Sequence, residues 1–176
     1  MESRAAASQR GARPVRLRQA AEEAAPPPRQ ARRGGGDMKA REVEGLDPGT
    51  PLQPNASRIV RTRLDELRAF APGALTPDAA TAQHDMRIAA KRLRYVLEIV
   101  GPCIGAEAKA ARNAAKRLQS VLGDLHDCDL MLPKVETIES LSAILRDRRE
   151  RLFHEFVERW QIEASKGTWA ALETAL

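Results

Sequence analysis

Apolar residues recur every three or four positions through most of the second two thirds of the chain, which is the spacing of amphipathic helices. Four long stretches show it, at residues 56–70, 77–100, 106–138 and 141–163, and a short one follows at 168–175. Long alternating or β-branched runs, which would indicate strands, are missing from the sequence. The pattern predicts an all-α fold, an antiparallel bundle of four to five helices.

Residues with strong positional preferences predict where these helices begin and end. Asn55 is a good N-cap for the first helix, and Pro72-Gly73 should stop it. Thr76-Pro77 resembles an N-cap followed by a proline at the first position of the second helix, which should end at Gly101-Pro102. Gly123 is expected to break or bend the third helix, and Pro133 to kink or end it.

The apolar side of each predicted helix supplies the expected core. Its members are Ile59, Val60, Leu64, Leu67 and Phe70; Met86, Ala89, Ala90, Leu93, Val96, Leu97 and Val100; Leu118, Val121, Leu122 and Leu125; and Leu141, Ile144, Leu145, Leu152, Phe153, Phe156 and Trp160.

The first 54 residues lack such a pattern. Proline and glycine runs at 24–28 and 34–36, set among alanines and arginines, cannot bury a core. We expect a disordered basic tail at 1–54 and a helical bundle at 55–176. Both Met1 and Met38 are candidate translation starts, and a native peptide from residues 1–37 would exclude Met38.

Composition limits the classes of partner that the protein is expected to bind. The chain carries 29 basic and 24 acidic side chains, a net charge of +5, which favours anionic partners. Cys103 and Cys128 have no metal or redox spacing, so free thiols in a reducing cytoplasm are expected. Apolar runs fall well short of the roughly 18 residues of a membrane span, so no membrane partner is predicted.

Cations crowd one side of two predicted helices. On the second helix this side holds His84, Arg87, Lys91, Arg94, Tyr95 and Glu98, and on the third it holds Lys109, Arg112, Lys116, Gln119 and Gly123. Like charges three or four residues apart repel, so an anion between the two helices would stabilise them. This indicates a phosphate-rich polyanion, because arginine and lysine both bind phosphate oxygens. The alternative is two solvated faces, with cations paired to groups such as Glu98.

The residues also bear on other functions. His84-Asp85 and His126-Asp127 are the dipeptides that a metal-dependent phosphohydrolase could use, but the further ligands such an enzyme needs are missing. Neither a catalytic triad in a known sequence context nor a phosphate-binding glycine loop is found, so we predict no catalytic residues, no metal and no cofactor. Without interleaved aromatic residues, sequence-specific nucleic-acid recognition is not expected. A non-catalytic helical module for other acidic partners stays open.

The combined pattern His84-x-x-Arg87-x-x-x-Lys91-Arg92-x-Arg94-Tyr95-x-x-Glu98, followed by Lys116-x-x-Gln119-x-x-Leu122-Gly123-x-x-x-Asp127, resembles the CHAD family, the conserved histidine α-helical domain. The resemblance implies an all-helical module that binds inorganic polyphosphate in a basic groove, often at polyphosphate granules, without catalysis. Carried onto matching positions, the binding residues are His84, Arg87, Lys91, Arg94 and Lys116, with Tyr95 and Gln119. Supporting positions are Lys109, Arg112, Glu98, His126 and Asp127, of which Asp127 is expected to orient the cations.

The chain departs from the family in length. A full CHAD domain usually has two four-helix halves related by a pseudo-two-fold axis, whereas this chain has one copy of the motif and about one half of the fold. We therefore predict a homodimer in which two chains rebuild the two-fold groove.

Overall fold

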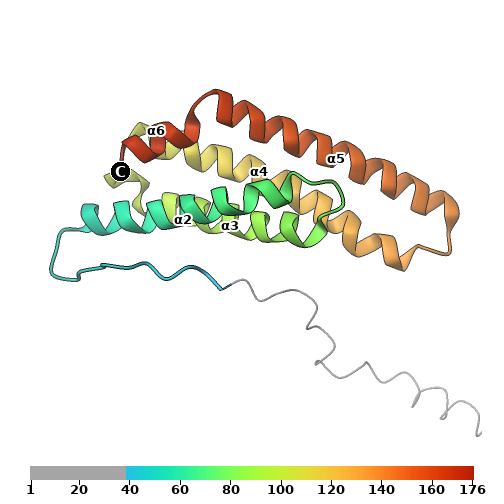
Figure 1. Cartoon of the computed structure of the whole chain (residues 1–176), viewed down its shortest axis with the longest axis horizontal. Coiled ribbons are helices and arrows are strands. Elements are labelled where there is room, and N and C mark those ends of the chain that lie inside the picture. The colour runs from blue at the N-terminus through green and yellow to red at the C-terminus, as the bar shows by residue number, and fades with distance from the viewer. Residues whose placement is uncertain (1–38) are drawn as a thin grey trace, which may run out of the picture. The chain divides into compact units, whose positions relative to one another are not determined.

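The computed structural model describes residues 39–176, and the all-α prediction is confirmed for this part of the chain. The helices, labelled in Figure 1, are α2 (Leu52–Ala74), α3 (Ala80–Val100), α4 (Ala106–Met131), α5 (Glu139–Ser165) and α6 (Thr168–Thr174), with short 3₁₀ turns at Gly101–Cys103 and Leu132–Lys134. The disorder predicted for residues 1–38 lies outside the described residues.

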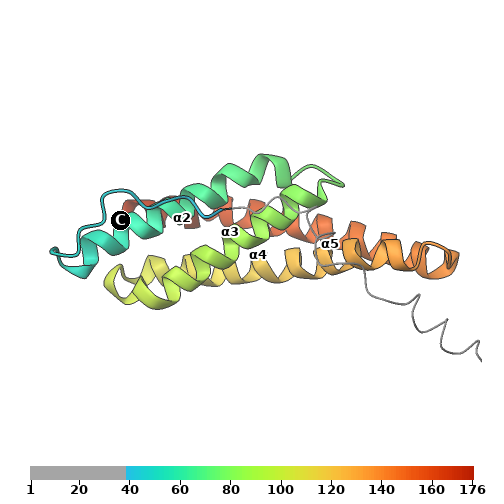
Figure 2. The same ribbon diagram turned by 90° about the horizontal axis from the view of Figure 1, so that it is seen from below.

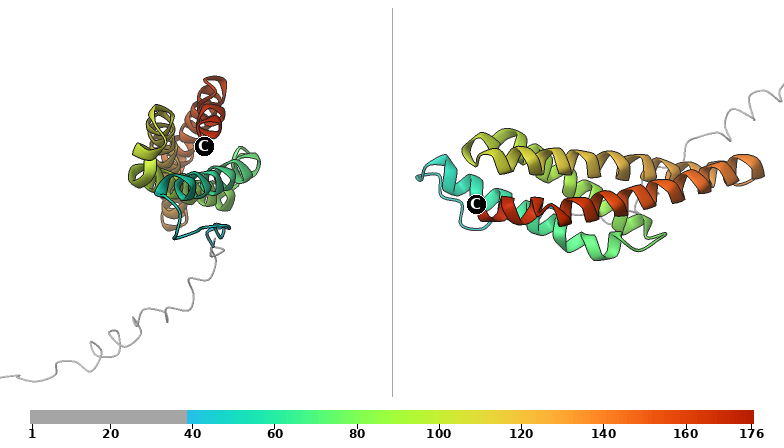
Figure 3. Two further views of the ribbon diagram at one scale, coloured as in Figure 1. Left: turned by 90° about the vertical axis from the view of Figure 1, so that its left-hand side faces the viewer. Right: turned by 90° about the horizontal axis from the view of Figure 1, so that it is seen from above.

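Successive helices pack side by side and run antiparallel. α3 lies between α2 and α4, α5 turns back along α4, and α6 packs on α4 and α5 (Figures 1 and 2). The α4–α5 hairpin extends past the turn between α2 and α3, as the views in Figures 1 and 3 show. α2 and α3 therefore lie along only part of this hairpin and do not reach its far end.

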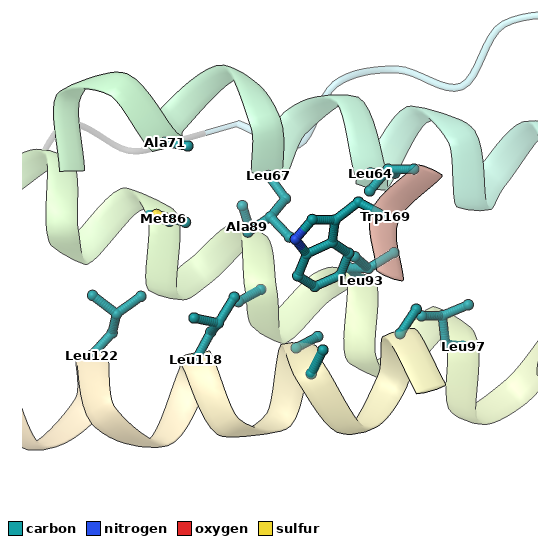
Figure 4. Close-up of a cluster of buried hydrophobic side chains, with 14 of the residues drawn as sticks. Leu64, Leu67, Ala71, Met86, Ala89, Leu93, Leu97, Leu118, Leu122 and Trp169 are labelled. Atoms are coloured by element: carbon teal, nitrogen blue, oxygen red, sulfur yellow. The ribbon is translucent and has the colours of Figure 1, made fainter. Parts of the chain in front are cut away.

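The core is built from the apolar faces that the sequence predicts in α2, α3 and α4. Leu64, Leu67, Met86, Leu93, Leu118 and Leu122 are fully buried and meet in the cluster of Figure 4. Trp169 of α6 closes this cluster. The start of α4 adds small residues that the hydrophobic pattern did not single out: Ala108, Ala111, Ala114 and Ala115. Such residues allow neighbouring helices to approach closely.

α2 begins at Leu52, three residues before the predicted N-cap. Asn55 is already inside the helix, where its amide accepts a hydrogen bond from the Asp47 backbone N–H at 3.1 Å and donates to the Asp47 carbonyl at 2.8 Å. Its side chain thus holds the preceding loop. The segment before α2 also contacts the helix further along, because Arg63 donates a hydrogen bond to the Arg41 carbonyl. Residues 39–51 therefore lack helix but are anchored to α2.

The predicted junction between α2 and α3 is wrong at both sides. α2 continues through Pro72 and Gly73 to Ala74, because its last turn buries Ala71 and Ala74 in the core. α3 begins at Ala80, after a loop in which Asp78 takes a positive φ of 60°. Proline is tolerated here because its missing N–H and its ring affect one turn at the helix end.

Arg149 of α5 holds this loop in place. Its guanidinium donates to Asp129 of α4 at 2.6 Å, to Asp78 at 3.0 Å and to Gln83 of α3 at 3.1 Å. Gln83 in turn donates to the Thr76 carbonyl at 3.0 Å. Arg149 is 9% exposed, so one buried cation joins three parts of the chain.

The side-chain carboxylates of Glu163 and Glu173 hold the last helix, α6, in place. Glu163 accepts from Arg117 of α4 at 2.6 Å and from the Thr168 hydroxyl at 2.8 Å. Although burial raises the pKa of Glu163, these hydrogen bonds and the charge of Arg117 hold it below its usual range. Glu173 of α6 pairs with Arg68 of α2 at 2.7 Å. Together these contacts fix α6 across α2 and α4.

Two further expectations are corrected. α4 runs unbroken through Gly123, where a break or bend was predicted, whereas the predicted boundary at Pro133 is confirmed, because α4 ends at Met131 and Pro133 lies in the 3₁₀ turn that follows. On α5, Phe153 and Phe156 are buried as predicted, but Leu141 and Ile144 are 44% and 61% exposed. They lie on the part of the hairpin that α2 and α3 do not reach, so no neighbouring helix covers them.

None of the helices between residues 39 and 176 is long and apolar enough to cross a membrane.

Candidate functional site

The register between α3 and α4 is fixed by three contacts. The rings of His84 and His126 lie 4.6 Å apart, tilted by 46°. A Cβ atom on Gly123 would stand 3.5 Å from the Arg87 Nε atom, and one on Gly101 the same distance from the Ala108 Cβ. In these pairs the residue number rises along α3 as it falls along α4, so one antiparallel register holds over the whole contact.

This register aligns the two cationic faces. Between the His84–His126 and Gly101–Ala108 contacts it places Lys91 opposite Gln119, Arg94 opposite Lys116 and Glu98 opposite Arg112. We call the resulting surface the polar stripe: His84, Arg87, Lys91, Arg94 and Glu98 of α3 with Arg112, Lys116, Gln119, Gly123 and His126 of α4. Both sets repeat at alternating steps of three and four residues. At about 1.5 Å per residue the polar stripe is roughly 21 Å long.

Several polar atoms of the polar stripe are buried without a hydrogen-bond partner among residues 39–176. They are His84 Nδ1, Arg87 Nε, Arg94 Nε and Gln119 Oε1. Leaving such an atom unsatisfied costs about 1–3 kcal/mol, so it marks a place where water or a ligand supplies the partner. The four atoms come from both helices and are spread along the polar stripe from His84 to Arg94. A ligand contacting them would therefore bridge α3 and α4.

Tyr95 positions the cations beside it. The Arg94 guanidinium carbon lies 4.3 Å from the centre of the Tyr95 ring, and the Lys91 ammonium lies 5.9 Å from it. Arg94 Nε is also 3.7 Å from a Glu98 carboxylate oxygen. Arg94 is thereby held between an aromatic face and a carboxylate, while the half-exposed Tyr95 keeps its edge in contact with solvent.

The other predicted positions lie within the polar stripe, as Arg112 and Lys116 do, or beside it, as Lys109 and Asp127 do. Lys109 and Lys116 are exposed, Arg112 is half-buried and donates to its neighbour Asn113, and Asp127 is exposed beside His126. Every residue predicted for the site therefore lies on α3 or α4, and the structure brings the two groups to one surface.

Arg92, which is part of the sequence motif, serves a different contact. Its guanidinium faces Glu66 of α2, 3.8 Å from the carboxylate. Glu66 is 1% exposed and also accepts from Arg63 at 2.9 Å. The hydrophobic pattern did not single out this buried carboxylate. The spacing of Arg63 and Glu66, three residues apart on one helix side, is the signal that could have found it.

The charges around His126 disfavour its protonation. Burial lowers the pKa of His126 below its ordinary value, and the neighbouring His84 and Arg87 lower it further, whereas Asp127 and Asp129 oppose the shift. The free site thus keeps His126 neutral over a wider pH range than an isolated histidine. An anion bound at this end would favour its protonated form.

We predict that the protein loses stability on acidification through this histidine. In the unfolded chain His126 takes up its proton near pH 6.5, whereas in the folded chain its lowered pKa delays the uptake until lower pH. The unfolded state then binds more protons than the folded state. The stability that neutral His126 contributes is therefore present above about pH 6.5 and is lost as the pH falls below that value. Urea denaturation between pH 7.5 and pH 5 measures the effect. A His126→Gln variant should show a shallower pH dependence, and an unchanged slope would contradict the prediction.

Metal ligands are not grouped in the described structure. Between residues 39 and 176, no cluster of three or more histidine, cysteine, aspartate or glutamate side chains could hold a metal ion. The His84–His126 pair brings the two His-Asp dipeptides together, and the cations of the polar stripe, such as Arg87, lie beside it.

Comparison with known proteins agrees with the resemblance seen in the sequence. The family model described as CHAD domain matches residues 2–136. This range includes α2, α3 and α4, and hence the whole polar stripe, and it ends before α5. No curated protein matches the chain, and no solved structure matches it either.

Proposed function

Because the chain belongs to the CHAD domain family, which is associated with polyphosphate binding, we propose that it binds inorganic polyphosphate along the polar stripe. The observation that supports this most is the pairing of two cationic helix faces in one register, with unpartnered polar atoms from both. A linear polyanion presents negative charge at a regular interval along its length. A straight row of cations is the surface that complements it.

The residues of the polar stripe have different tasks in this proposal. Arg87 and Arg94 offer planar donors to phosphate oxygens, while Lys91 and Lys116 offer compact charges that accept varied geometry. His126 binds the anion best when protonated, so affinity should rise as the pH falls. The His84 ring lies against it and offers a further hydrogen bond. Gln119 and Tyr95 add neutral hydrogen bonds, Lys109 and Arg112 extend the positive surface, and Asp127 and Glu98 orient the cations.

We further propose that the module acts by binding and not by catalysis, in the cytoplasm and at polyphosphate granules. As the chain holds one copy of the family motif, we also propose a homodimer. Whether the two chains join their polar stripes into one groove, as predicted from the sequence, or pair through another surface is tested by the experiments below.

Titration of the full chain with polyphosphate across a salt series tests the function. Cations that bind a linear polyanion release counterions, so the logarithm of the affinity should fall linearly with the logarithm of the salt concentration. Competition with DNA and RNA of equal charge should favour polyphosphate. Equal competition would support a general module for acidic partners instead. Release of phosphate that requires added Mg²⁺ or Mn²⁺, and that is lost in His126→Gln, would support the phosphohydrolase alternative.

A further inference from the structure

Apolar and charged side chains recur at heptad spacing on the outward side of α5, although no helix of the described chain covers that side. α5 packs mainly on α4 and α6, through residues such as Phe153 and Phe156. On the opposite side, steps of four and three residues connect Ile144, Arg148, Arg151, Glu155, Glu158 and Ile162. We call these six residues the α5 seam. Ile144 and Ile162 are 61% and 40% exposed, and the Arg151 and Glu155 side chains are 66% and 44% exposed.

The α5 seam reads as apolar, basic, basic, acidic, acidic, apolar, and its spacing is the same in both directions. Two antiparallel copies therefore match at every position. Ile144 meets Ile162 of the partner subunit, Arg148 meets Glu158 of the partner subunit, and Arg151 meets Glu155 of the partner subunit. In a parallel pair, arginines would meet arginines and glutamates would meet glutamates, which is unfavourable. The charge pattern of the α5 seam therefore favours an antiparallel over a parallel pairing of identical chains.

We propose that two copies of this protein pair through the α5 seam, around a two-fold axis between Arg151 and Glu155. Symmetry produces each contact twice, giving two isoleucine contacts at the ends and four arginine–glutamate contacts between them. Within one chain Arg151 pairs with Asp147 and Glu155 with Arg159. These pairs are exposed, and with the arginine–glutamate contacts between the chains they would form one network of alternating charges.

This pairing leaves the polar stripe open. Lys116 and Gln119 lie on a different side of α4 from Arg117, whose guanidinium pairs with Glu163 of α5 at 2.6 Å. The α5 seam shares no residue with the polar stripe, so this pairing does not use the joined groove predicted from the sequence. The inference rests on the proposed homodimer but not on polyphosphate binding. The residues changed in its test lie outside the polar stripe, so failure of one proposal is distinguishable from failure of the other.

Charge exchange on α5 tests the pairing. Sedimentation equilibrium of the full chain at 50 mM salt should show a dimer that weakens at 500 mM, because exposed ion pairs are screened by salt. Arg148→Glu combined with Arg151→Glu makes all four charged positions acidic and should raise the dimer dissociation constant at least tenfold. Adding Glu155→Arg and Glu158→Arg restores complementarity and the original net charge, so the fourfold variant should dimerise again.

Each outcome of these experiments either supports or overturns the proposal. A wild-type protein that is monomeric at every concentration and salt tested would overturn the proposal. So would a double variant that dimerises like the wild type, or a fourfold variant that is folded and stays monomeric. Circular dichroism shows whether each variant is folded, and polyphosphate binding by the double variant reports whether the polar stripe is intact. If the fourfold variant fails to fold, an equimolar mixture of the Arg148→Glu/Arg151→Glu and Glu155→Arg/Glu158→Arg proteins should form a heterodimer, and its absence would overturn the proposal.

Discussion

Replacing Lys91 and Arg94 together with glutamate is expected to abolish polyphosphate binding while the helices remain folded. Both side chains lie in the middle of the polar stripe, beside Tyr95, and the Arg94 side chain is 16% exposed. The change removes two cations and places two carboxylates against the polyanion. We expect the affinity to fall at least 100-fold, which corresponds to about 2.7 kcal/mol. Isothermal titration with polyphosphate measures the loss, and circular dichroism shows the retained helix content.

A matched control distinguishes the loss of the binding surface from the change in net charge. Lys134 and Arg146 are exposed and lie outside both the polar stripe and the α5 seam, so Lys134→Glu with Arg146→Glu gives the same change in net charge. This control should keep most of the affinity at moderate salt. If both double variants bind equally, the polar stripe is not the binding surface. Neutralising Lys91 and Arg94 with glutamine should reduce the slope of affinity against salt by about two.

Removing the side chain of Arg149 is expected to give the largest loss of stability. This guanidinium donates to Asp78, Asp129 and Gln83, which belong to three different parts of the chain. Arg149→Ala leaves Asp129, whose side chain is 16% exposed, and the buried Gln83 without their cationic partner. Breaking a buried ionic network in this way costs about 3–5 kcal/mol. Urea denaturation of the variant and the wild type measures the difference.

The neighbouring Arg146 provides the comparison, because it is exposed on the same helix. Arg146→Ala should change the free energy of unfolding by no more than about 0.5 kcal/mol. A loss below about 1 kcal/mol in Arg149→Ala would mean that the loop between α2 and α3 is held by other contacts. The predicted loss concerns the fold, so any folded fraction of Arg149→Ala should still bind polyphosphate.

The placement of the candidate residues on one face of each of two helices was predictable, because they repeat at helical spacing. His84, Arg87 and Lys91 share one side of α3 at spacings that follow from the helix period alone. The partners of these residues could not be predicted in the same way. Arg92 belongs to the same sequence motif but contacts the buried Glu66 of α2, and this depends on where α2 packs.

Helix ends and the surface of α5 were less predictable. Asn55 and Pro72 have strong local preferences, but tertiary contacts extend α2 past both of them. Leu141 and Ile144 have the spacing of core residues and are exposed, because α2 and α3 end before they reach that part of the hairpin. A local pattern tells which side of a helix is apolar, but not whether another helix is long enough to cover it.

By itself, the sequence determined that the protein is helical, which faces are apolar, and that two helices carry cations at matching intervals. These properties follow from the 3.6-residue period, which each helix has independently of its neighbours. Only the tertiary structure decided that His84 meets His126, that one register joins the two cationic faces, and that Arg149 closes the loop before α3. Such contacts depend on the relative translation and rotation of whole helices, which the packing of buried side chains such as Leu93 and Leu118 sets.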